Sequence, residues 1–169
     1  MKSNLYWSAG SWPGKLAVSS RPRGGDWLED EIRAWKNFGI DIVVSLLTDD
    51  EVVDLNLENE AKFCQAHGLR YFSFPIIDRS VPSSRKATLD FVNKLDEALI
   101  EGQSLLIHCR QGIGRAALIA ACLLVLSGDD PETAFQRVSA ARGVAVPETP
   151  EQKRWGIEFA GKLAAPILN

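Results

Sequence analysis

Residues 105–126 read LLIHCRQGIGRAALIAACLLVL, and this stretch decides the fold. It begins with three branched apolar side chains, as a short buried strand would, and continues into a loop with two glycines over 109–115. Residues 116–126 are eleven consecutive apolar side chains. A bilayer span needs about twenty, so we expect a helix buried inside a protein. The stretch therefore predicts a strand, a loop and a helix in immediate succession.

Similar strand and helix patterns alternate along the rest of the chain. Strands are expected at 16–19, 40–47, 70–74 and 105–108. Helices are expected to begin at Asp26, Leu55, Ser84, Arg115, Asp130 and Thr149, the first ending at Gly39 and the second at His67. This alternation predicts one α/β domain over residues 1–169, with a central, mostly parallel sheet flanked by helices on both faces. Ligands in such folds bind beyond the carboxyl ends of the strands, here the loops after Phe74 and His108.

The composition argues against several classes of protein. The 169 residues carry 19 Lys and Arg against 22 Asp and Glu, a net charge of −3, so we expect no nucleic-acid binding. Three cysteines without a Cys-x-x-Cys pair cannot form a disulfide framework and favour a reducing compartment. Residues 1–7 lack the apolar stretch of a secretion signal, so we expect a cytoplasmic monomer away from membranes. Residues 28–60 hold ten acidic and two basic residues, which we interpret as a solvated acidic flank.

The loop at 109–115 joins a cysteine at a strand end to an arginine in the first turn of a helix. If the five intervening backbone N–H groups curl inward, they form a concave site for an anion, and the helix amino terminus adds positive potential. Gly112 and Gly114 permit positive φ values and the close approach of an oxyanion. Arg115 can donate two parallel N–H bonds to a phosphate. The same surroundings are expected to lower the pKa of Cys109 well below about 8.5.

This arrangement predicts a nucleophilic thiolate beside a phosphate-binding loop. Attack on a phosphoester would form a thiophosphate whose oxygens are held by the amides and Arg115, and neither a metal nor a cofactor is required. A purely structural interpretation makes Cys109 a small buried apolar residue and Arg115 an exposed helix residue. That interpretation leaves the two glycines and the strand–loop–helix context unexplained. Two histidines and three scattered cysteines form no recognisable zinc set.

Residues 108–115, HCRQGIGR, resemble the His-Cys-x-x-Gly-x-x-Arg signature of the protein tyrosine phosphatase superfamily. Residues 75–82, PIIDRSVP, resemble the general-acid loop of small dual-specificity phosphatases, and residues 148–152, ETPEQ, resemble the segment that carries their water-positioning glutamine. Residues 21–27, RPRGGDW, are similar to an amino-terminal loop of compact bacterial members. The resemblance covers nearly the whole chain. It implies hydrolysis of phosphotyrosine in a phosphorylated protein or peptide, with phosphoserine and phosphothreonine as further substrates.

The resemblance makes Asp78 the general acid. It would protonate the leaving oxygen and, once deprotonated, activate the water that hydrolyses the thiophosphate. The alternative is a carboxylate that only stabilises a turn before Pro82. Asp26, Asp49 and Glu148 are weaker substitutes for the acid.

Two further residues carry roles that the resemblance implies. Gln152 would orient the attacking water, but it lies three residues after Thr149, the spacing of a capping box, so capping its helix is an equal alternative. His108 precedes the nucleophile on the strand, so its side chain points to the opposite face, and we expect it to fix the loop backbone through hydrogen bonds. Cys122 lies two or more helical turns from Cys109, on the order of 10 Å away, too far for a disulfide.

The loop residues after Cys109 are expected to bind substrate. They are Arg110, Gln111, Gly112, Ile113, Gly114 and Arg115. We expect the side chains of Arg110 and Gln111 to point outward and touch the substrate beyond its phosphate. Three more arginines could do the same or be solvated charges: Arg21, Arg23 and Arg79.

One position departs from the family pattern. Ala116 occupies the place of a Ser or Thr whose hydroxyl bonds the thiolate and helps the intermediate break down, which predicts slower turnover. Three alternative functions stay open on the sequence: a catalytically weak phosphate-binding module, a rhodanese-like sulfur transferase, and a phosphatase for a non-protein phosphoester such as a phosphoinositide or an RNA 5′-phosphate.

Overall fold

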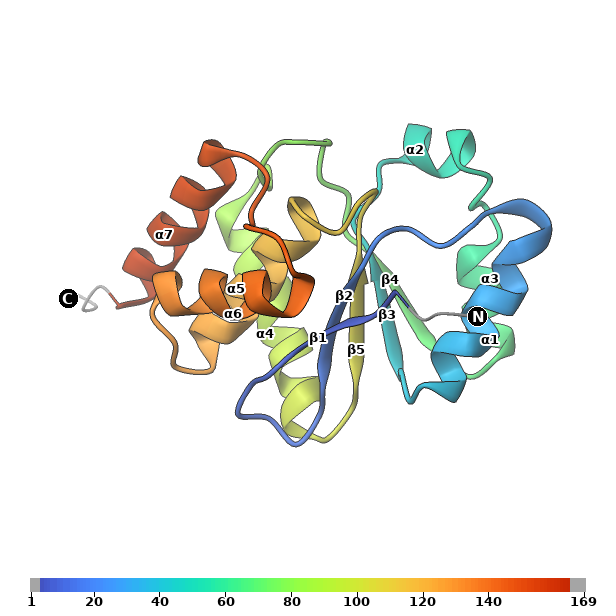
Figure 1. The fold of residues 1–169 in the computed structure, drawn as a ribbon, viewed down its shortest axis with the longest axis horizontal. Helices are drawn as coiled ribbons and strands as arrows, with labels where there is room; N and C mark the ends of the chain where they lie inside the picture. Colours follow the sequence, from blue (N-terminus) through green and yellow to red (C-terminus); the bar gives the residue numbers. More distant parts are fainter. Residues whose placement is uncertain (1–3, 165–169) are drawn as a thin grey trace.

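A five-stranded sheet with the order β1-β2-β5-β3-β4 forms the centre of the computed structural model, which describes residues 4–164 (Figure 1). Residues 1–3 and 165–169 of the predicted domain lie outside the described residues. The strands are β1 (Tyr6–Ser8), β2 (Leu16–Ser19), β3 (Ile42–Ser45), β4 (Arg70–Ser73) and β5 (Leu105–His108). β1 is antiparallel to β2, and the other neighbouring strands are parallel. The predicted α/β architecture with a mostly parallel sheet is confirmed.

Helices cover both faces of the sheet. They are the 3-10 turn η1 (Gly25–Trp27) and the helices α1 (Leu28–Asn37), α2 (Asp49–Asp54), α3 (Glu60–Ala66), α4 (Arg85–Ile100), α5 (Arg115–Leu126), α6 (Pro131–Arg142) and α7 (Pro150–Ala164). Alternate residues of a strand point to opposite faces. Val18, Val44 and Ile107 therefore join the core beneath α4 and α5, whereas their neighbours Ala17, Val43 and Leu106 join the core beneath α1 and α3.

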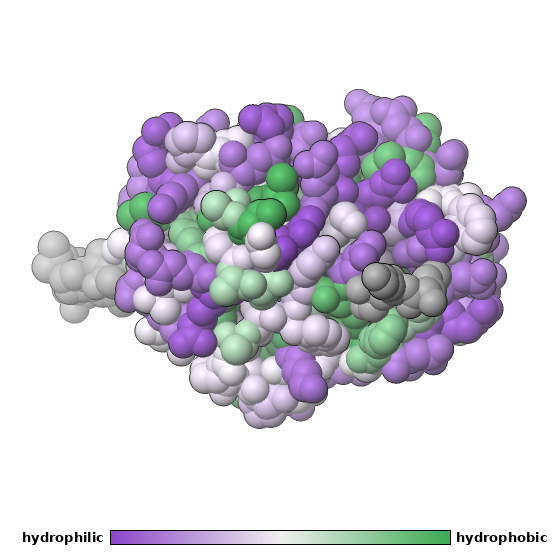
Figure 2. Space-filling model, viewed as in Figure 1, coloured by the Kyte–Doolittle hydropathy of each residue, from purple (hydrophilic) through white to green (hydrophobic). Residues whose placement is uncertain are grey.

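Helix α5 lies inside the protein, as its apolar run predicts. Every residue from Arg115 to Leu124 is buried, because α4, α6 and α7 pack around the helix. The apolar side chains of the molecule gather mainly in these two cores. Figure 2 shows a face covered largely by hydrophilic side chains, with the apolar ones in separate patches. No helix over residues 4–164 is long and apolar enough to cross a membrane.

Several expected elements differ from the structure. The helix expected over 55–67 is wrong, because the chain forms α2 and α3 instead, with a break at Asn56, whose φ is 56°. Asp26 does not cap the first helix, since it lies in η1 and Trp27 takes the N-cap position without a side-chain hydrogen bond. The strand expected at 40–47 is shorter, and β1 was not expected.

The carboxyl ends of four strands lie side by side at one edge of the sheet. His108 of β5 is in register with Ser19 of β2 and with Ser45 of β3, and Ser45 is in register with Ser73 of β4. The loops that follow these strands therefore meet at this edge, which is where parallel sheets place their ligand sites.

Candidate active site

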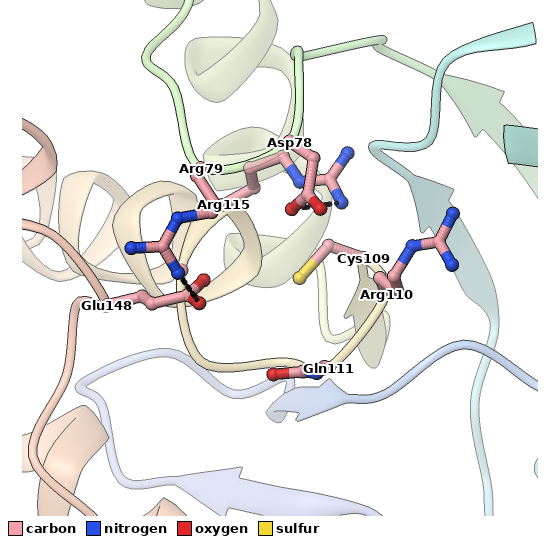
Figure 3. Close-up of a pocket in the computed structure, with 8 residues that line it drawn as sticks. Asp78, Arg79, Cys109, Arg110, Gln111, Arg115 and Glu148 are labelled. Atoms are coloured by element: carbon pink, nitrogen blue, oxygen red, sulfur yellow. Dashed lines mark hydrogen bonds and ion pairs between the residues drawn. The ribbon is translucent and has the colours of Figure 1, made fainter. Parts of the chain in front are cut away.

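A cavity of about 170 Å³ lies at this edge, between three segments of the chain (Figure 3). One segment is the loop after β5 with the first residue of α5, the second is the loop after β4, and the third directly precedes α7. The lining residues are Asp78, Arg79, Cys109, Arg110, Gln111, Gly114, Arg115 and Glu148. Six of the predicted site residues, Asp78, Cys109, Arg110, Gln111, Gly114 and Arg115, meet here from two separate loops.

The sulfur of Cys109 faces the cavity from the end of β5 (Figure 3). Only 3% of the residue is exposed, and the backbone N–H of Gly112 donates a hydrogen bond of 3.2 Å to Sγ. This loop amide is thus turned toward the sulfur, as predicted. Gly112 has φ of 75°, and a Cβ there would lie 2.8 Å from the backbone of Ser19, so only glycine fits this position.

Gly114 favours the site for a different reason than expected. Its φ is −116°, so the predicted need for a positive φ is wrong at this position. A Cβ on Gly114 would instead lie 3.0 Å from Oε2 of Glu148 and 3.1 Å from the amide of Gln152. The absence of a side chain lets the segment before α7 approach the loop closely.

The guanidinium of Arg115 is buried and held on several sides. Nη1 donates to Oε1 of Glu51 at 2.7 Å and to the carbonyl oxygen of Ile76 at 2.8 Å. Nη2 donates to Oε2 of Glu51 at 3.0 Å and to Oδ1 of Asp78 at 3.0 Å. Burial by itself lowers the pKa of Arg115, but the hydrogen bonds that it donates to Glu51, together with the nearby negative charges of Glu51, Asp78 and Cys109, outweigh burial and raise that pKa, so the group stays charged. The side chain is fixed before any substrate binds.

Glu51 is the functional residue that the sequence analysis missed. It also accepts a hydrogen bond of 3.2 Å from Nε of Arg110, and it forms a capping box with Thr48 at the start of α2. Burial raises its pKa, but the hydrogen bonds from Arg115 and from the Thr48 backbone lower it to about 2. The interpretation of residues 28–60 as a solvated flank is therefore wrong for Glu51. The Thr48-x-x-Glu51 spacing of a capping box marks the start of α2, but it does not indicate the contact with Arg115.

Asp78 and Cys109 line the same cavity, with Asp78 in the loop after β4 (Figure 3). The Asp78 side chain is 48% exposed, in contrast to its partner Arg115 at 1%. One carboxylate oxygen is bound to that guanidinium, and the carboxylate projects into the cavity. The Asp78 carboxylate and the Cys109 sulfur thus lie on the same cavity.

Two residues on the cavity wall form an ion pair across segments. Nη1 of Arg79 lies 2.5 Å from Oε1 of Glu148, which joins the loop after β4 to the segment before α7. Arg79 has a φ of 61°, a left-handed backbone conformation that a residue with a side chain adopts rarely. Among the arginines outside the loop, Arg79 reaches the cavity, whereas Arg23 pairs with Glu31 on an exposed surface.

Comparison with known proteins assigns the family. Residues 17–129 match a family model described as "Polymorphic toxin system, DSP-PTPase phosphatase", which covers more than half of the chain. The chain belongs to the DSP-PTPase phosphatases. It is a cysteine-dependent phosphatase of the tyrosine and dual-specificity kind, which confirms the resemblance seen in the sequence and sets the sulfur-transfer alternative aside.

Relatives of this phosphatase support the assignment. Cyclin-dependent kinase inhibitor 3 of Rattus norvegicus is 29% identical over 144 residues, which cover 84% of this chain and 68% of the relative. The fold matches a crystal structure of kinase associated phosphatase with a TM-score of 0.88, at 24% identity and 99% coverage of both chains. It also matches the active form of Tk-PTP with a TM-score of 0.78, at 27% identity, over 96% of this chain and 99% of that one.

Gln152 lies beside the cavity of the phosphatase and does not line it. Its residue is fully buried, Oε1 accepts from the backbone N–H of Thr149 at 3.2 Å, and Nε2 donates to the carbonyl oxygen of Ser80 at 3.0 Å. The Thr149 hydroxyl in turn accepts from the backbone N–H of Gln152, so the predicted capping box is confirmed. The side chain thereby connects α7 to the loop that carries Asp78.

His108 lies on the face of the sheet opposite the cavity, as predicted. Its Nε2 is 2.6 Å from Oε2 of Glu60, and both side chains are buried. Nδ1 has no hydrogen-bond partner among residues 4–164, and the ring pairs with Glu60 instead, so the expected bond from His108 to the loop backbone is wrong. Glu60 is the second carboxylate of the 28–60 segment that is buried instead of solvated.

The other candidates are core residues. Ile113 packs against the hydrophobic core, and Ala116 is fully buried at the start of α5 without a hydroxyl to offer. All three cysteines are free, and burial raises the pKa of Cys122 above its ordinary range and that of Cys64 to about 12. Within residues 4–164 no three His, Cys, Asp or Glu side chains gather as metal ligands would.

Proposed function

We propose that this phosphatase hydrolyses phosphotyrosine, and also phosphoserine and phosphothreonine, in proteins through a cysteinyl-phosphate intermediate. The observation that carries the proposal is the convergence of the Cys109 sulfur, the fixed Arg115 guanidinium and the Asp78 carboxylate on one cavity. These groups are the nucleophile, the phosphate clamp and the proton donor of such a reaction.

In the first half-reaction the thiolate of Cys109 attacks phosphorus while the ester oxygen leaves with its electron pair. Asp78 gives that oxygen its proton, and the loop amides with Arg115 hold the equatorial oxygens. Arg115 presents Nη2 to Asp78 in the free enzyme, so the incoming phosphate replaces Asp78 on this guanidinium. The exchange releases the carboxylate to take up the proton that it later donates.

In the second half-reaction a water molecule attacks phosphorus and the phosphorus–sulfur electron pair returns to Cys109. The ionised Asp78 accepts the proton of that water. A water-orienting role for Gln152 requires its amide to leave both Ser80 and Thr149, whereas Asp78 already faces the cavity. We therefore assign the activation of water to Asp78.

The lining of the cavity supports a broad choice of phosphorylated side chain. Its residues are charged, polar or small, and none carries an aromatic ring that would stack on a phenol. Recognition thus rests on the phosphoryl group, which phosphotyrosine, phosphoserine and phosphothreonine share. This favours dual specificity over a tyrosine-only enzyme.

The charge balance at the cavity disfavours substrates with several phosphate groups. Arg79 is paired with Glu148, and Arg110 is paired with Glu51, so neither arginine adds an uncompensated charge for a second phosphate. A phosphoinositide or an RNA 5′-triphosphate would therefore gain little binding energy from Arg79 and Arg110. A singly phosphorylated peptide needs only the loop amides and Arg115 to bind its phosphate.

We further propose a cellular compartment and an oligomeric state for this phosphatase. The three free cysteines support a reducing compartment such as the cytoplasm. We also propose that the enzyme acts as a monomer, since the nucleophile, the guanidinium and the carboxylate that the proposed reaction needs all line one cavity and call for no residue of a second copy.

The test is hydrolysis of an aryl phosphate in the presence of a chelator. We expect turnover by the wild-type protein, loss of turnover in Cys109→Ser, and retention in Cys122→Ala, which removes a buried thiol outside the cavity. Binding of phosphate without turnover by the wild type would favour the phosphate-binding module. A panel of phosphotyrosine, phosphoserine and phosphothreonine peptides beside a soluble phosphoinositide then separates the substrate classes.

A further inference from the structure

The loop that carries Asp78 is tied to the segment that leads into α7. Nη1 of Arg79 lies 2.5 Å from Oε1 of Glu148, and the carbonyl oxygen of Ser80 accepts a hydrogen bond of 3.0 Å from Nε2 of Gln152. The two residues that directly follow Asp78 are thus each held by residues 148–152. Figure 3 shows Arg79 and Glu148 meeting at one side of the cavity, with Cys109 at the other.

The same segment also rests on the catalytic loop. Oε2 of Glu148 and the amide of Gln152 lie 3.0 and 3.1 Å from the position of a Cβ on Gly114. Nη2 of Arg142, at the end of α6, donates to the carbonyl oxygen of Gln111 at 3.1 Å. The chain between α6 and α7 therefore contacts both loops that must work together.

These contacts become decisive once substrate binds. In the structure Asp78 is also held by Arg115, and in the proposed reaction the phosphate takes its place on that guanidinium. What then keeps Asp78 beside the leaving oxygen is the pairing of Arg79 with Glu148 and the hydrogen bond from Gln152 to Ser80. The left-handed backbone of Arg79 needs such outside support, because an L side chain adopts that conformation rarely.

We propose that Glu148 is a positioning residue for the general acid: through Arg79 it keeps Asp78 directed into the cavity during phosphoryl transfer. The inference rests on the proposed function, in which Asp78 donates the proton. Glu148 touches neither phosphorus nor the leaving oxygen in this role. The Arg79 side chain is 63% exposed and that of Glu148 is 22% exposed, so the pair lies where the cavity meets solvent.

The first test compares Glu148→Gln with the wild type on aryl phosphates whose leaving phenols differ in acidity. General acid catalysis contributes about 10²–10⁴-fold, so a misplaced Asp78 is expected to lower kcat roughly tenfold for poor leaving groups and little for good ones. Glu158→Gln is the matched control, because Glu158 is an exposed carboxylate of α7 whose ion pair with Arg85 lies outside the cavity. An equal loss for all leaving groups, or no loss, would overturn the proposal.

The second test does not depend on turnover. The backbone N–H of Ser80 donates to the carbonyl oxygen of Ile77 at 3.0 Å inside the acid loop. Hydrogen–deuterium exchange at this amide is expected to be faster in Glu148→Gln than in the wild type and in Glu158→Gln, and equal rates would refute the positioning role of Glu148. If the wild type hydrolyses no phosphoester, the proposed function fails, while the exchange rates still decide whether Glu148 holds the loop.

Discussion

Replacing Glu51 by Gln tests how the phosphate clamp is fixed. Glu51 pairs with the buried Arg115 through two hydrogen bonds, and its pKa is lowered from 4.5 to about 2. At about 1.4 kcal/mol for each tenfold change in acidity, that lowering corresponds to about 3 kcal/mol of folding stability. In other proteins, removing one partner of a buried ion pair lowers the free energy of unfolding by about 3–5 kcal/mol, which is similar to this value.

The sign of the pH dependence follows from the lowered pKa. The stabilisation is fully present above the unfolded-state pKa near 4.5 and is lost as the pH falls toward the folded-state value of about 2. The wild type should therefore be about 3 kcal/mol more stable than Glu51→Gln at pH 7, and the difference should shrink between pH 4.5 and 2. Urea unfolding followed by tryptophan fluorescence at several pH values measures it.

Two results would refute this reasoning. One is a difference in unfolding free energy that stays constant from pH 7 to pH 2, and the other is a difference at pH 7 no larger than that of the exposed control Glu158→Gln. A surface substitution of that kind changes stability by less than about 0.5 kcal/mol. We also expect Glu51→Gln to lower kcat/KM, because Arg115 loses the carboxylate that orients its guanidinium toward the bound phosphate.

Three further substitutions have defined outcomes. Asp78→Asn should lower kcat by about 10²–10⁴-fold for poor leaving groups and less for good ones, and equal losses across an aryl phosphate series would show that Asp78 is not the proton donor. Gly112→Ala should cost about 1–3 kcal/mol in thermal or urea unfolding and abolish turnover, since φ is 75° and the new Cβ would lie 2.8 Å from the Ser19 backbone; wild-type activity would contradict the loop geometry. Ala116→Ser should speed release of phosphate in rapid-quench kinetics, because the resemblance to the family implies that a hydroxyl at this position bonds the thiolate, and an unchanged or slower rate would count against that role.

The fold and the catalytic loop could be predicted because their signals are local. An apolar strand, a loop with two glycines and an apolar helix follow one another without a gap, and each type of element has its own period. The rule that loops at the carboxyl ends of parallel strands meet indicated the loop after Phe74, and the resemblance singled out Asp78 within that loop. Cys109, Arg115 and Asp78 accordingly line one cavity.

Contacts between distant segments could not be predicted from local pattern. Glu51 lies in a run of acidic residues that looks solvated, and it is buried only because Arg115, 64 positions away, turns toward α2. Glu60 is buried in the same way by His108. The break between α2 and α3 depends on the left-handed conformation of Asn56, which no periodicity in the sequence marks.

Gln152 illustrates why one residue supported two predictions. The Thr149-x-x-Gln152 spacing indicates a capping box, and the resemblance indicates a role beside the substrate. In the structure the side chain completes the capping box and also reaches Ser80. Its oxygen accepts a hydrogen bond from the backbone N–H of Thr149 at the start of α7, and its nitrogen donates one to the carbonyl oxygen of Ser80 in the loop that carries Asp78. The two ends of one amide have separate functions.

The most direct measurement is the identity of the atom that carries phosphorus during turnover. The protein would be mixed with a phosphotyrosine peptide, quenched within milliseconds, digested and analysed by mass spectrometry. A phosphate on Cys109 in the wild type, absent from Cys109→Ala together with all turnover, is the predicted result. Turnover that proceeds in Cys109→Ala, or a phosphate found on another residue, would contradict the account.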